Sequence, residues 1–379
     1  MPRHDGGRLV LAVDVSPWLR PDAGSAAQRA FCWVRGRSRN TGQAIPGWPY
    51  SILVAVEPGR SSWVAVLDAV RLVPGDDVTA VTGAQVRATI DRLRDTGQWQ
   101  PGDPPIMVLC DAGYDLTRLA WLLADLPLVV AGRVRSDRVY RATPPPSTGL
   151  RGRPARHGTR LDLTQPATGP RPDQTTATTT RRYGTATATA WHRMHQRLTH
   201  RDGWTHHDGP LPVIDGTVIR LHTDRYPKPL WLWTSEPTPD ATAVDRCWQA
   251  YLRRFDIEHW FRFCKQTLGW TTPRLRDPAA ADRWTWLIIA AYTQLRLARH
   301  HSTDLRRPWE RPITPTSHLT PNRVRRGFRY LRTKLPQPAR VPKNTRPGPG
   351  RPPGSRNRQP TPHHDPGKPQ SSTTKTSKG

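Results

Sequence analysis

Two short apolar runs that each end in an aspartate constrain the fold of this chain more than any other feature. The first is RLVLAVD, from Arg8 to Asp14, and the second is IMVLCD, residues 106–111. Each run has the length and composition of a buried strand. Strands joined by helical crossovers form a mixed sheet, and ligands gather beyond the carboxyl ends of its parallel strands. We therefore expect Asp14 and Asp111 to lie together at that edge.

The segments around these runs predict an α/β domain over residues 8–137. Gly, Asn and Pro separate the apolar runs, and helical periodicity appears between the later ones. The expected order of elements is βββ-α-β-α-β. The predicted strands are 8–14, 30–34, 50–57, 106–110 and 128–134, and the predicted helices are 61–72, 79–95 and 116–126.

A change of composition after residue 137 predicts an insertion over residues 138–242. Residues 138–208 are rich in Thr, Arg, Pro and Gly and contain few apolar residues, which favours loops and partial disorder. Strand character returns at 211–220 and at 229–234, where the motif WLW places two Trp on one face. A β-rich insertion is therefore expected between the second aspartate and the helical segment that follows.

The charge of the chain points to a polyanionic partner. The sequence holds 58 Lys and Arg against 30 Asp and Glu, a formal net charge of +28 over 379 residues. Such a charge attracts nucleic acid and disfavours cationic partners. No apolar run approaches the roughly 20 residues that span a bilayer, and an aspartate interrupts the N-terminal apolar run. The four cysteines are too far apart for a zinc knuckle or a disulfide framework. We therefore expect a cytoplasmic protein without a membrane partner.

A polar stripe in the helical segment 243–300 is the most informative pattern for chemistry. Tyr251, Arg254, Glu258 and Lys265 fall within about 60° of one another on a helix that advances about 100° per residue. Apolar residues occupy the opposite face and can hold the helix against a core. An acid, two cations and a phenol are costly to bury as packing. The stripe is therefore expected to face a cleft, where it would offer a metal ligand and grip phosphates.

The spacing Tyr-x2-Arg-x3-Glu-x6-Lys, with one aspartate ending a first strand and another ending a fourth, resembles the YREK signature of bacterial insertion-sequence DDE transposases. The motifs RLVLAVDVSPW, VLCDAGYD and LRDPAAADRWTWLIIAAYTQLRLAR extend the resemblance over most of the chain. The resemblance implies an RNase H-like mixed sheet with flanking helices. The acids would lie on two adjacent strands and a helix, and a β-rich insertion would precede the helix that carries Glu258.

Asp14, Asp111 and Glu258 are the expected catalytic residues and metal ligands. Carboxylates are hard oxygen ligands that suit Mg²⁺, with Mn²⁺ as a substitute. Two such ions can generate the attacking hydroxide and stabilise the leaving 3′ oxygen of an in-line displacement at phosphorus. No covalent protein–DNA intermediate is then needed. The released 3′-OH can attack the other strand or target DNA in the same site.

Five residues are expected to contact DNA. Arg254 and Lys265 would clamp phosphates near the scissile bond, and Tyr251 would hydrogen-bond to one. The resemblance also implies that a Trp on the strand before the helix stacks on a flipped base at the element end. Trp231 and Trp233 are the candidates for that Trp. The alternative is that both belong to the core of the insertion.

The remaining segments are mostly basic. Residues 301–335 are expected to form a basic extension with a helix at 323–331, either lying on DNA or solvated, and residues 336–379 a disordered Pro/Arg-rich tail. Two Arg-Pro motifs, at 151–154 and 349–352, would contact a minor groove or phosphates without sequence preference. The histidines between 192 and 207 lack zinc-site spacing and are expected to be solvated or to face phosphates.

Together these features predict a DNA transposase that hydrolyses phosphodiester bonds at element ends and transfers the 3′-OH. Duplex DNA is the expected partner, with a homodimer in the DNA-bound synaptic complex and a nucleoid-associated location. Only seven residues precede the first strand, where transposases of this type usually carry an end-recognition domain. Two alternatives therefore stay open. One is a truncated remnant that binds DNA without transposing, and the other is an RNase H-like structure-selective nuclease.

Overall fold

A computed structural model describes residues 1–35, 42–59, 61–145, 155–181, 183–315, 318–333, 354 and 360–368. The chain forms two compact units, which we describe separately. Unit 1 consists of Met1–Ser16, Tyr50–Leu72 and Asp76–Arg262, and unit 2 consists of Pro17–Pro49, Val73–Gly75 and Phe263–Gly379. No helix in the described ranges is long and apolar enough to cross a membrane.

The secondary structure alternates strands and helices first and then turns to a run of strands. The strands are β1 (Val10–Leu19), β2 (Ala30–Arg35), β3 (Gly42–Val56), β4 (Val64–Arg71), β5 (Ile106–Cys110), β6 (Leu128–Arg133), β7 (Val139–Ala142), β8 (Arg160–Asp162), β9 (Gln174–Thr180), β10 (Gly184–His195), β11 (Gly216–Thr223) and β12 (Tyr226–Thr234). The α-helices are α1 (Val78–Asp95), α2 (Leu116–Leu122), α3 (Ala241–Arg253), α4 (Asp256–Phe263), α5 (Pro278–Ala298) and α6 (Pro321–Arg332). A π-helical turn, η4 (Cys264–Leu268), follows α4.

The strands of unit 1 form one mixed sheet. The order is β4, β3, β1, β5, β6, β12, β11, β10, β7 and β8, and β9 also pairs with β10. Strand β5 pairs in parallel with both β1 and β6, and β12 pairs antiparallel to β6. Strands β7 to β12 are the β-rich insertion, which therefore extends the same sheet. The predicted RNase H-like mixed sheet with flanking helices and a β-rich insertion is confirmed.

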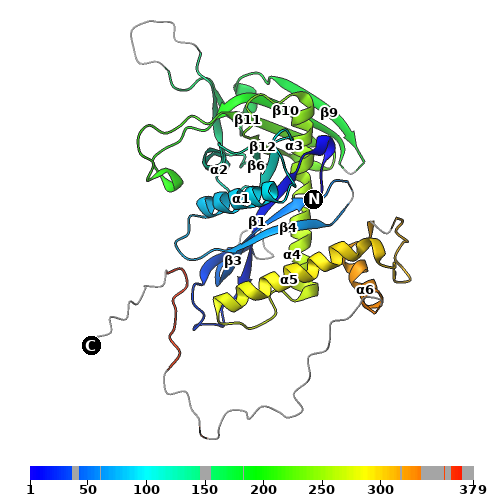
Figure 1. The fold of residues 1–379 in the computed structure, drawn as a ribbon. Coiled ribbons are helices and arrows are strands. Elements are labelled where there is room, and N and C mark those ends of the chain that lie inside the picture. The colour runs from blue at the N-terminus through cyan, green and yellow to red at the C-terminus, as the bar shows by residue number, and fades with distance from the viewer. Residues whose placement is uncertain are drawn as a thin grey trace, which may run out of the picture. The chain divides into compact units, whose positions relative to one another are not determined.

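The core of unit 1 lies between the sheet and the helices α1 and α2. Leu11 and Val13 of β1 are fully buried there together with Val86 and Ile90 of α1 and Leu119 of α2. The two helices also contact each other, as Figure 1 shows. Asp77 begins α1 by accepting hydrogen bonds from the backbone N–H groups of its first turn. Helix α3 instead contacts β9 and β10 of the insertion.

The register between β1 and β5 sets the two predicted aspartates side by side. Ala12 lies opposite Leu109 in this parallel pair. Two residues further along, the same register brings Asp14 opposite Asp111. Because side chains alternate between the faces of a sheet, Asp14 points to the face opposite the core residue Val13. The sequence-based expectation that both aspartates lie at one edge agrees with this geometry.

The helix predicted at 61–72 is wrong, because this segment forms strand β4. Val64, Val66 and Val70 recur at even spacing, and β-branched residues favour an extended backbone. Strand β4 pairs antiparallel with β3 over Tyr50–Val56. This pairing overrides the helical spacing of the apolar residues.

Parts of the stretch 138–208 are also more regular than its composition predicts. Strand β9 consists mainly of Thr, and the first half of β10 alternates Thr and Ala. Ala186, Ala188 and Ala190 are fully buried, and the threonines between them occupy the other face. Alanine contributes little to a hydrophobicity pattern, so the strand period is hidden in the sequence although it is complete in the structure. The Arg-Pro motif at 151–154 lies outside the described residues.

Unit 2 combines the pairing of β2 with the first half of β3, helices α5 and α6, and a short piece of the C-terminal region. Helix α6 covers the predicted helix at 323–331. Two of its arginines are neutralised within the unit, since Arg323 pairs with Asp304 and Arg326 with Glu310. Of the predicted disordered tail, residue 354 and residues 360–368 are described. The Arg-Pro motif at 349–352 falls outside the described part.

Candidate active site

The first acid, Asp14, lies in β1 and is held by two partners. One carboxylate oxygen accepts a hydrogen bond from the backbone N–H of Val15 at 2.8 Å. The other oxygen accepts from the guanidinium of Arg254 at 3.0 Å. Only 18% of the Asp14 side chain is exposed. The carboxylate is therefore fixed in a largely dry position in the middle of β1, two residues beyond the last pair of β1 with β5.

Arg254 joins the two aspartates. Its Nη1 contacts Asp14, and its Nη2 lies 3.6 Å from Oδ2 of Asp111. The hydroxyl of Tyr251 donates to Oδ1 of Asp111 at 3.2 Å, and the guanidinium lies 5.7 Å from the centre of the Tyr251 ring. Four of the residues singled out in the sequence therefore meet in unit 1, although they come from three distant parts of the chain.

The helix that carries the polar stripe is interrupted, which corrects the expectation of one continuous helix. Helix α3 ends at Arg253, and α4 begins at Asp256. Between them the backbone tightens, because the N–H of Ile257 donates to the carbonyl of Arg254 at 3.0 Å. Asp256 pairs with Arg253 at 2.6 Å. The break places Arg254 at a junction, where its guanidinium reaches the aspartates.

The third acid, Glu258, lies in the first turn of α4 and is half-buried. Its carboxylate makes no ion pair or side-chain hydrogen bond to any residue that the structure describes. Its charge nevertheless reaches Asp14. Burial raises the pKa of Asp14 to about 6, Arg254 opposes this rise, and the negative charges of Glu258 and Asp111 add to it. The three carboxylates thus share one electrostatic environment with a single guanidinium.

The three carboxylates are chemically suited to bind a divalent cation, but their oxygens are not gathered around one point. Three carboxylates and one guanidinium leave two negative charges uncompensated, and hard oxygen ligands are those that Mg²⁺ and Mn²⁺ prefer. Within the described ranges, no group of three or more His, Cys, Asp or Glu side chains is placed to hold a metal ion. The guanidinium of Arg254 provides the positive charge between Asp14 and Asp111. A cation bound by both aspartates would take over that role.

Lys265, the last residue of the stripe, belongs to unit 2. It lies in the π-helical turn η4, and its ammonium donates to the carbonyl of Pro17 at 2.9 Å. The ammonium also lies 5.6 Å from the centre of the Trp270 ring. Single π-helical turns often occur at functional sites. The expected contact of Lys265 with DNA remains a prediction from the sequence.

Trp231 and Trp233 do not present a surface to DNA, which contradicts the expectation that one of them stacks on a flipped base. They are 4% and 1% exposed. The ring of Trp231 packs against Trp191, and the indole N–H of Trp233 donates to the carbonyl of Met194. Both side chains are therefore part of the core of the insertion, which is the alternative left open above. The alternation of side chains along a strand correctly predicts that both Trp residues lie on the same face of the sheet. It does not predict which of the two faces is buried.

Two polar side chains near the sheet, half-buried Arg253 and buried His195, contact distant parts of the chain in ways that the sequence patterns do not predict. Arg253 donates to the carbonyls of Glu57 and Ser61 and pairs with Asp256. His195 is fully buried, with Nδ1 3.0 Å from Asp215 and Nε2 2.9 Å from Nδ1 of His157, so it is not solvated as expected. Burial lowers the pKa of His157, and the nearby His195 and arginines lower it further. His195 is the last residue of β10, and the alternation of buried alanines at even positions does not predict its burial, because a β-bulge between Trp191 and Met194 shifts the register.

These features together define a class. The mixed sheet, two aspartates on neighbouring parallel strands and a glutamate on a helix that returns to them are the features of an RNase H-like nuclease. A family model described as DDE superfamily endonuclease matches residues 1–198, slightly more than half of the chain, and the chain belongs to this family. The match contains Asp14 and Asp111 and ends before Glu258. No curated protein matches the chain.

Proposed function

We propose that this DDE superfamily endonuclease is a transposase of the insertion-sequence type, which cleaves DNA at element ends and transfers the 3′-OH. The observation that carries the proposal is the bridge formed by Arg254 between Asp14 and Asp111. The YREK spacing and the two aspartates that follow apolar runs are separate patterns in the sequence. Their meeting in one site supports the assignment of the stripe to the same chemistry as the aspartates.

Asp14, Asp111 and Glu258 would hold two Mg²⁺ ions, with Mn²⁺ as a substitute. Divalent cations bound there would supply the Lewis acidity that in-line displacement at phosphorus requires. The β1–β5 register orients both aspartates, and the hydrogen bond from Val15 fixes one oxygen of Asp14. Tyr251 orients Asp111 through its hydroxyl. Because Glu258 has no partner among the described residues, its carboxylate is available as the third ligand.

Arg254 has two tasks in this proposal. Without a cation it neutralises the aspartates and keeps them at one place. With a cation held by the aspartates, the guanidinium would be free to donate to phosphate oxygens next to the scissile bond, for which its planar pair of N–H groups is suited. Lys265 and Tyr251 are the other proposed phosphate contacts. The proposed substrate is duplex DNA, both the element ends and the target, and two copies of the chain would pair two ends at the nucleoid.

The experiment is cleavage of a duplex that carries the DNA flanking the gene, with Mg²⁺ or Mn²⁺ and with EDTA as control. The wild-type chain is expected to cut at one defined phosphate and to join the 3′ end to a second duplex. Glu258→Gln should abolish cleavage without weakening DNA binding, because the substitution removes a ligand and no cation. Glu236→Gln, a matched change outside the site, should cut normally.

Three outcomes separate the competing functions. Cleavage that is lost in Glu258→Gln and followed by strand transfer supports the transposase. Cleavage at branched or gapped structures without transfer would replace it by a structure-selective nuclease. A folded chain that binds DNA with no cleavage in either metal would support the remnant.

A further inference from the structure

A second feature of unit 1 is a cleft next to Asp111, which we call the arginine cleft. It has a volume of about 330 Å³. Three segments line it: the loop after β5 from Ala112 to Leu116, the end of β6 and the turn after it, and the segment that follows β10 as far as Trp204. The cleft begins at the residue after the second acid but contains none of the three acids of the candidate active site.

The lining of the cleft is strongly and unusually basic. Its charged residues are one acid, Asp115, and five arginines: Arg133, Arg135, Arg138, Arg197 and Arg201. All five arginines are exposed, and none has an ion pair or a side-chain hydrogen bond to the described part of the chain. Asp115 does not neutralise them, because it caps α2 by accepting from the backbone N–H of Arg118.

Some arginines elsewhere in unit 1 are paired with acids, in contrast to those of the cleft. Arg87 forms two hydrogen bonds to Asp125, and Arg118 pairs with Asp77. Guanidinium groups that converge without acids repel one another, and a bound anion would turn that repulsion into attraction. Arginine also presents paired N–H groups that match phosphate oxygens. The charge pattern therefore specifies a ligand with phosphate groups.

An independent observation points to the same kind of ligand. Trp204 lines the cleft and is 4% exposed, and its indole N–H is buried without an acceptor among the described residues. The rings of Trp121 and His207 lie about its ring, with centroids 5.4 Å and 5.5 Å away. A buried donor left without a partner costs about 1–3 kcal/mol. A phosphate oxygen in the cleft would supply the missing acceptor.

The charge of one cleft arginine also influences a residue of the candidate active site. Burial raises the pKa of Tyr251, and the positive charges of Arg254 and, more weakly, Arg133 oppose that rise. Arg133 therefore lies within electrostatic reach of a residue that hydrogen-bonds to Asp111. A volume near the lower end of ligand sites, which run from about 300 to 1,000 Å³, suits a short piece of one strand rather than a duplex.

We propose that the arginine cleft binds the phosphates of the nucleic-acid strand that continues from the scissile phosphate at the three acids. The inference rests on the proposed function and adds the path of the strand to it. The five arginines act as positioning residues, because they hold phosphates beyond the scissile bond and do not touch the reacting atoms. Trp204 donates its indole N–H to one of these phosphates.

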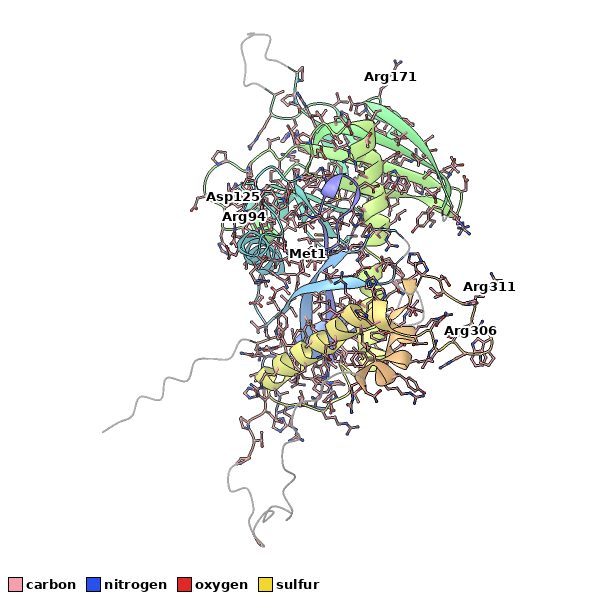
Figure 2. All side chains as sticks on the ribbon, turned by 45° about the vertical axis from the view of Figure 1, so that its right-hand side comes forward. Met1, Arg94, Asp125, Arg171, Arg306 and Arg311 are labelled. Atoms are coloured by element: carbon pink, nitrogen blue, oxygen red, sulfur yellow. The ribbon has the colours of Figure 1, made fainter. Side chains whose placement is uncertain are left out.

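The test is DNA binding measured by fluorescence anisotropy over a range of salt concentrations, on an oligonucleotide duplex with a single-stranded extension. Arg135→Ala/Arg138→Ala should weaken binding by about tenfold or more and reduce the slope of log K against log salt by about two, one for each lost phosphate contact. The matched control is Arg171→Ala/Arg225→Ala, which removes two exposed arginines of unit 1 that do not line the cleft. Figure 2 shows the Arg171 side chain at the periphery of the molecule. Because all four side chains are exposed, both double variants should keep the thermal midpoint of the wild type.

Trp204→Phe is the second variant, because it keeps an aromatic ring and removes only the donor. It should weaken binding several-fold without changing the salt slope, since no charge is lost. Equal effects of the cleft pair and the control pair would overturn the proposal and leave a non-specific basic surface.

A competition experiment shows which kind of phosphate compound the cleft binds. Inorganic phosphate, a mononucleotide and an oligonucleotide are compared at equal phosphate concentration as competitors. The oligonucleotide should compete best, and equal competition by inorganic phosphate would replace the strand by a free anion. The two proposals can fail separately. Absence of cleavage by the wild-type chain would contradict the proposed function. Unchanged DNA binding by the cleft variants, in a protein whose wild-type form cuts DNA, would contradict the role of the cleft.

Discussion

Among the single residues of the site, Arg254 supplies the positive charge that offsets the charges of the aspartates. It is 6% exposed and contacts two carboxylates that come from different strands. Removing one member of a buried charge cluster lowers the stability of the fold by more than the intact cluster adds to it, because the remaining charges stay buried and unpaired. The stability of the metal-free protein should therefore depend on this guanidinium more than on any ligand of the site.

We expect Arg254→Gln to lower the free energy of unfolding by about 3 kcal/mol in EDTA, because Asp14 and Asp111 then face each other without a cation. Mn²⁺ should restore part of this loss and should stabilise the variant more than the wild type, since no guanidinium competes for the aspartates. The measurement is urea unfolding with EDTA and with Mn²⁺, which requires no enzymatic activity.

The neighbouring substitution Arg253→Gln is the control for this prediction. Arg253 is also an arginine with a carboxylate partner, Asp256, but it has no contact with the aspartates of the site. The variant should lose stability with no extra response to Mn²⁺. The same recovery in both variants would show that Mn²⁺ does not bind where Arg254 lies.

Single residues were predicted unevenly from the sequence, for a physical reason. Asp14 and Asp111 could be found because an apolar run followed by a carboxylate is a local pattern, although β1 continues past Asp14 to Leu19 instead of ending there as predicted. The contact between Arg254 and these aspartates depends on the β1–β5 register and on the break between α3 and α4, and neither is local. Trp231 and Trp233 were misassigned because a buried Trp and an exposed one look the same in a strand pattern.

At the scale of elements, the approach of β6 to β5 controls the position of the second acid. Gly132 of β6 lies opposite Cys110, the residue before Asp111. A Cβ atom at Gly132 would lie 2.6 Å from the carbonyl oxygen of Cys110 and 2.8 Å from Cδ2 of Leu116. The absence of a side chain is thus what allows β6, β5 and α2 to meet at this point.

Gly132→Ala should destabilise the protein by about 2–3 kcal/mol, because a backbone oxygen cannot move aside without separating two strands. Gly83→Ala in α1 is the matched substitution, since its nearest atom would be Cδ1 of Leu122 at 3.6 Å, an ordinary contact. Alanine is favoured over glycine inside a helix by about 0.5–1 kcal/mol, so this variant should gain stability. Thermal unfolding of both variants gives the comparison, and a loss of equal size in both would contradict the argument.

Elements were predicted well where large apolar residues mark the period and poorly elsewhere. Strands β1 and β5 have such residues at almost every position, and both were found. The apolar residues of β4 also fit a helical spacing, so the sequence predicts a helix there, and pairing with β3 decides for the strand. Strand β10 was missed because the residues that it buries on one face are alanines, whose small side chains hardly differ in hydrophobicity from the threonines between them.

At the scale of the whole molecule, the structure links distant ends of the sequence within unit 2. The guanidinium of Arg29, which is 4% exposed, donates to the carbonyl of His364 at 2.9 Å. The backbone N–H of His364 donates to Gly24, and that of Gly367 donates to the carbonyl of Arg29. Residues 360–368 therefore contribute to the fold of a unit whose first strands lie more than three hundred residues earlier.

A chain that ends after Thr333 should be less stable than one that ends after Lys368, by about 1–3 kcal/mol, because Arg29 is left buried with one acceptor fewer. The chain that ends after Lys368 keeps these contacts and should unfold at the same temperature as the full chain. Circular dichroism melting curves of the three chains test this difference. Identical midpoints for both shortened chains would show that the contacts of residues 360–368 do not contribute to stability.

The pairing of β12 with β6 has a consequence for what can be removed from this protein. Thr234, Trp233 and Leu232 pair with Ala131, Gly132 and Arg133, so the insertion occupies the hydrogen-bonding side of β6 that points away from β5. Excision of the insertion would turn β6 into an open edge, whose unpaired N–H and C=O groups recruit strands from other chains. The insertion is therefore not a detachable module, and a minimal version of the catalytic sheet would have to cap that edge to avoid aggregation.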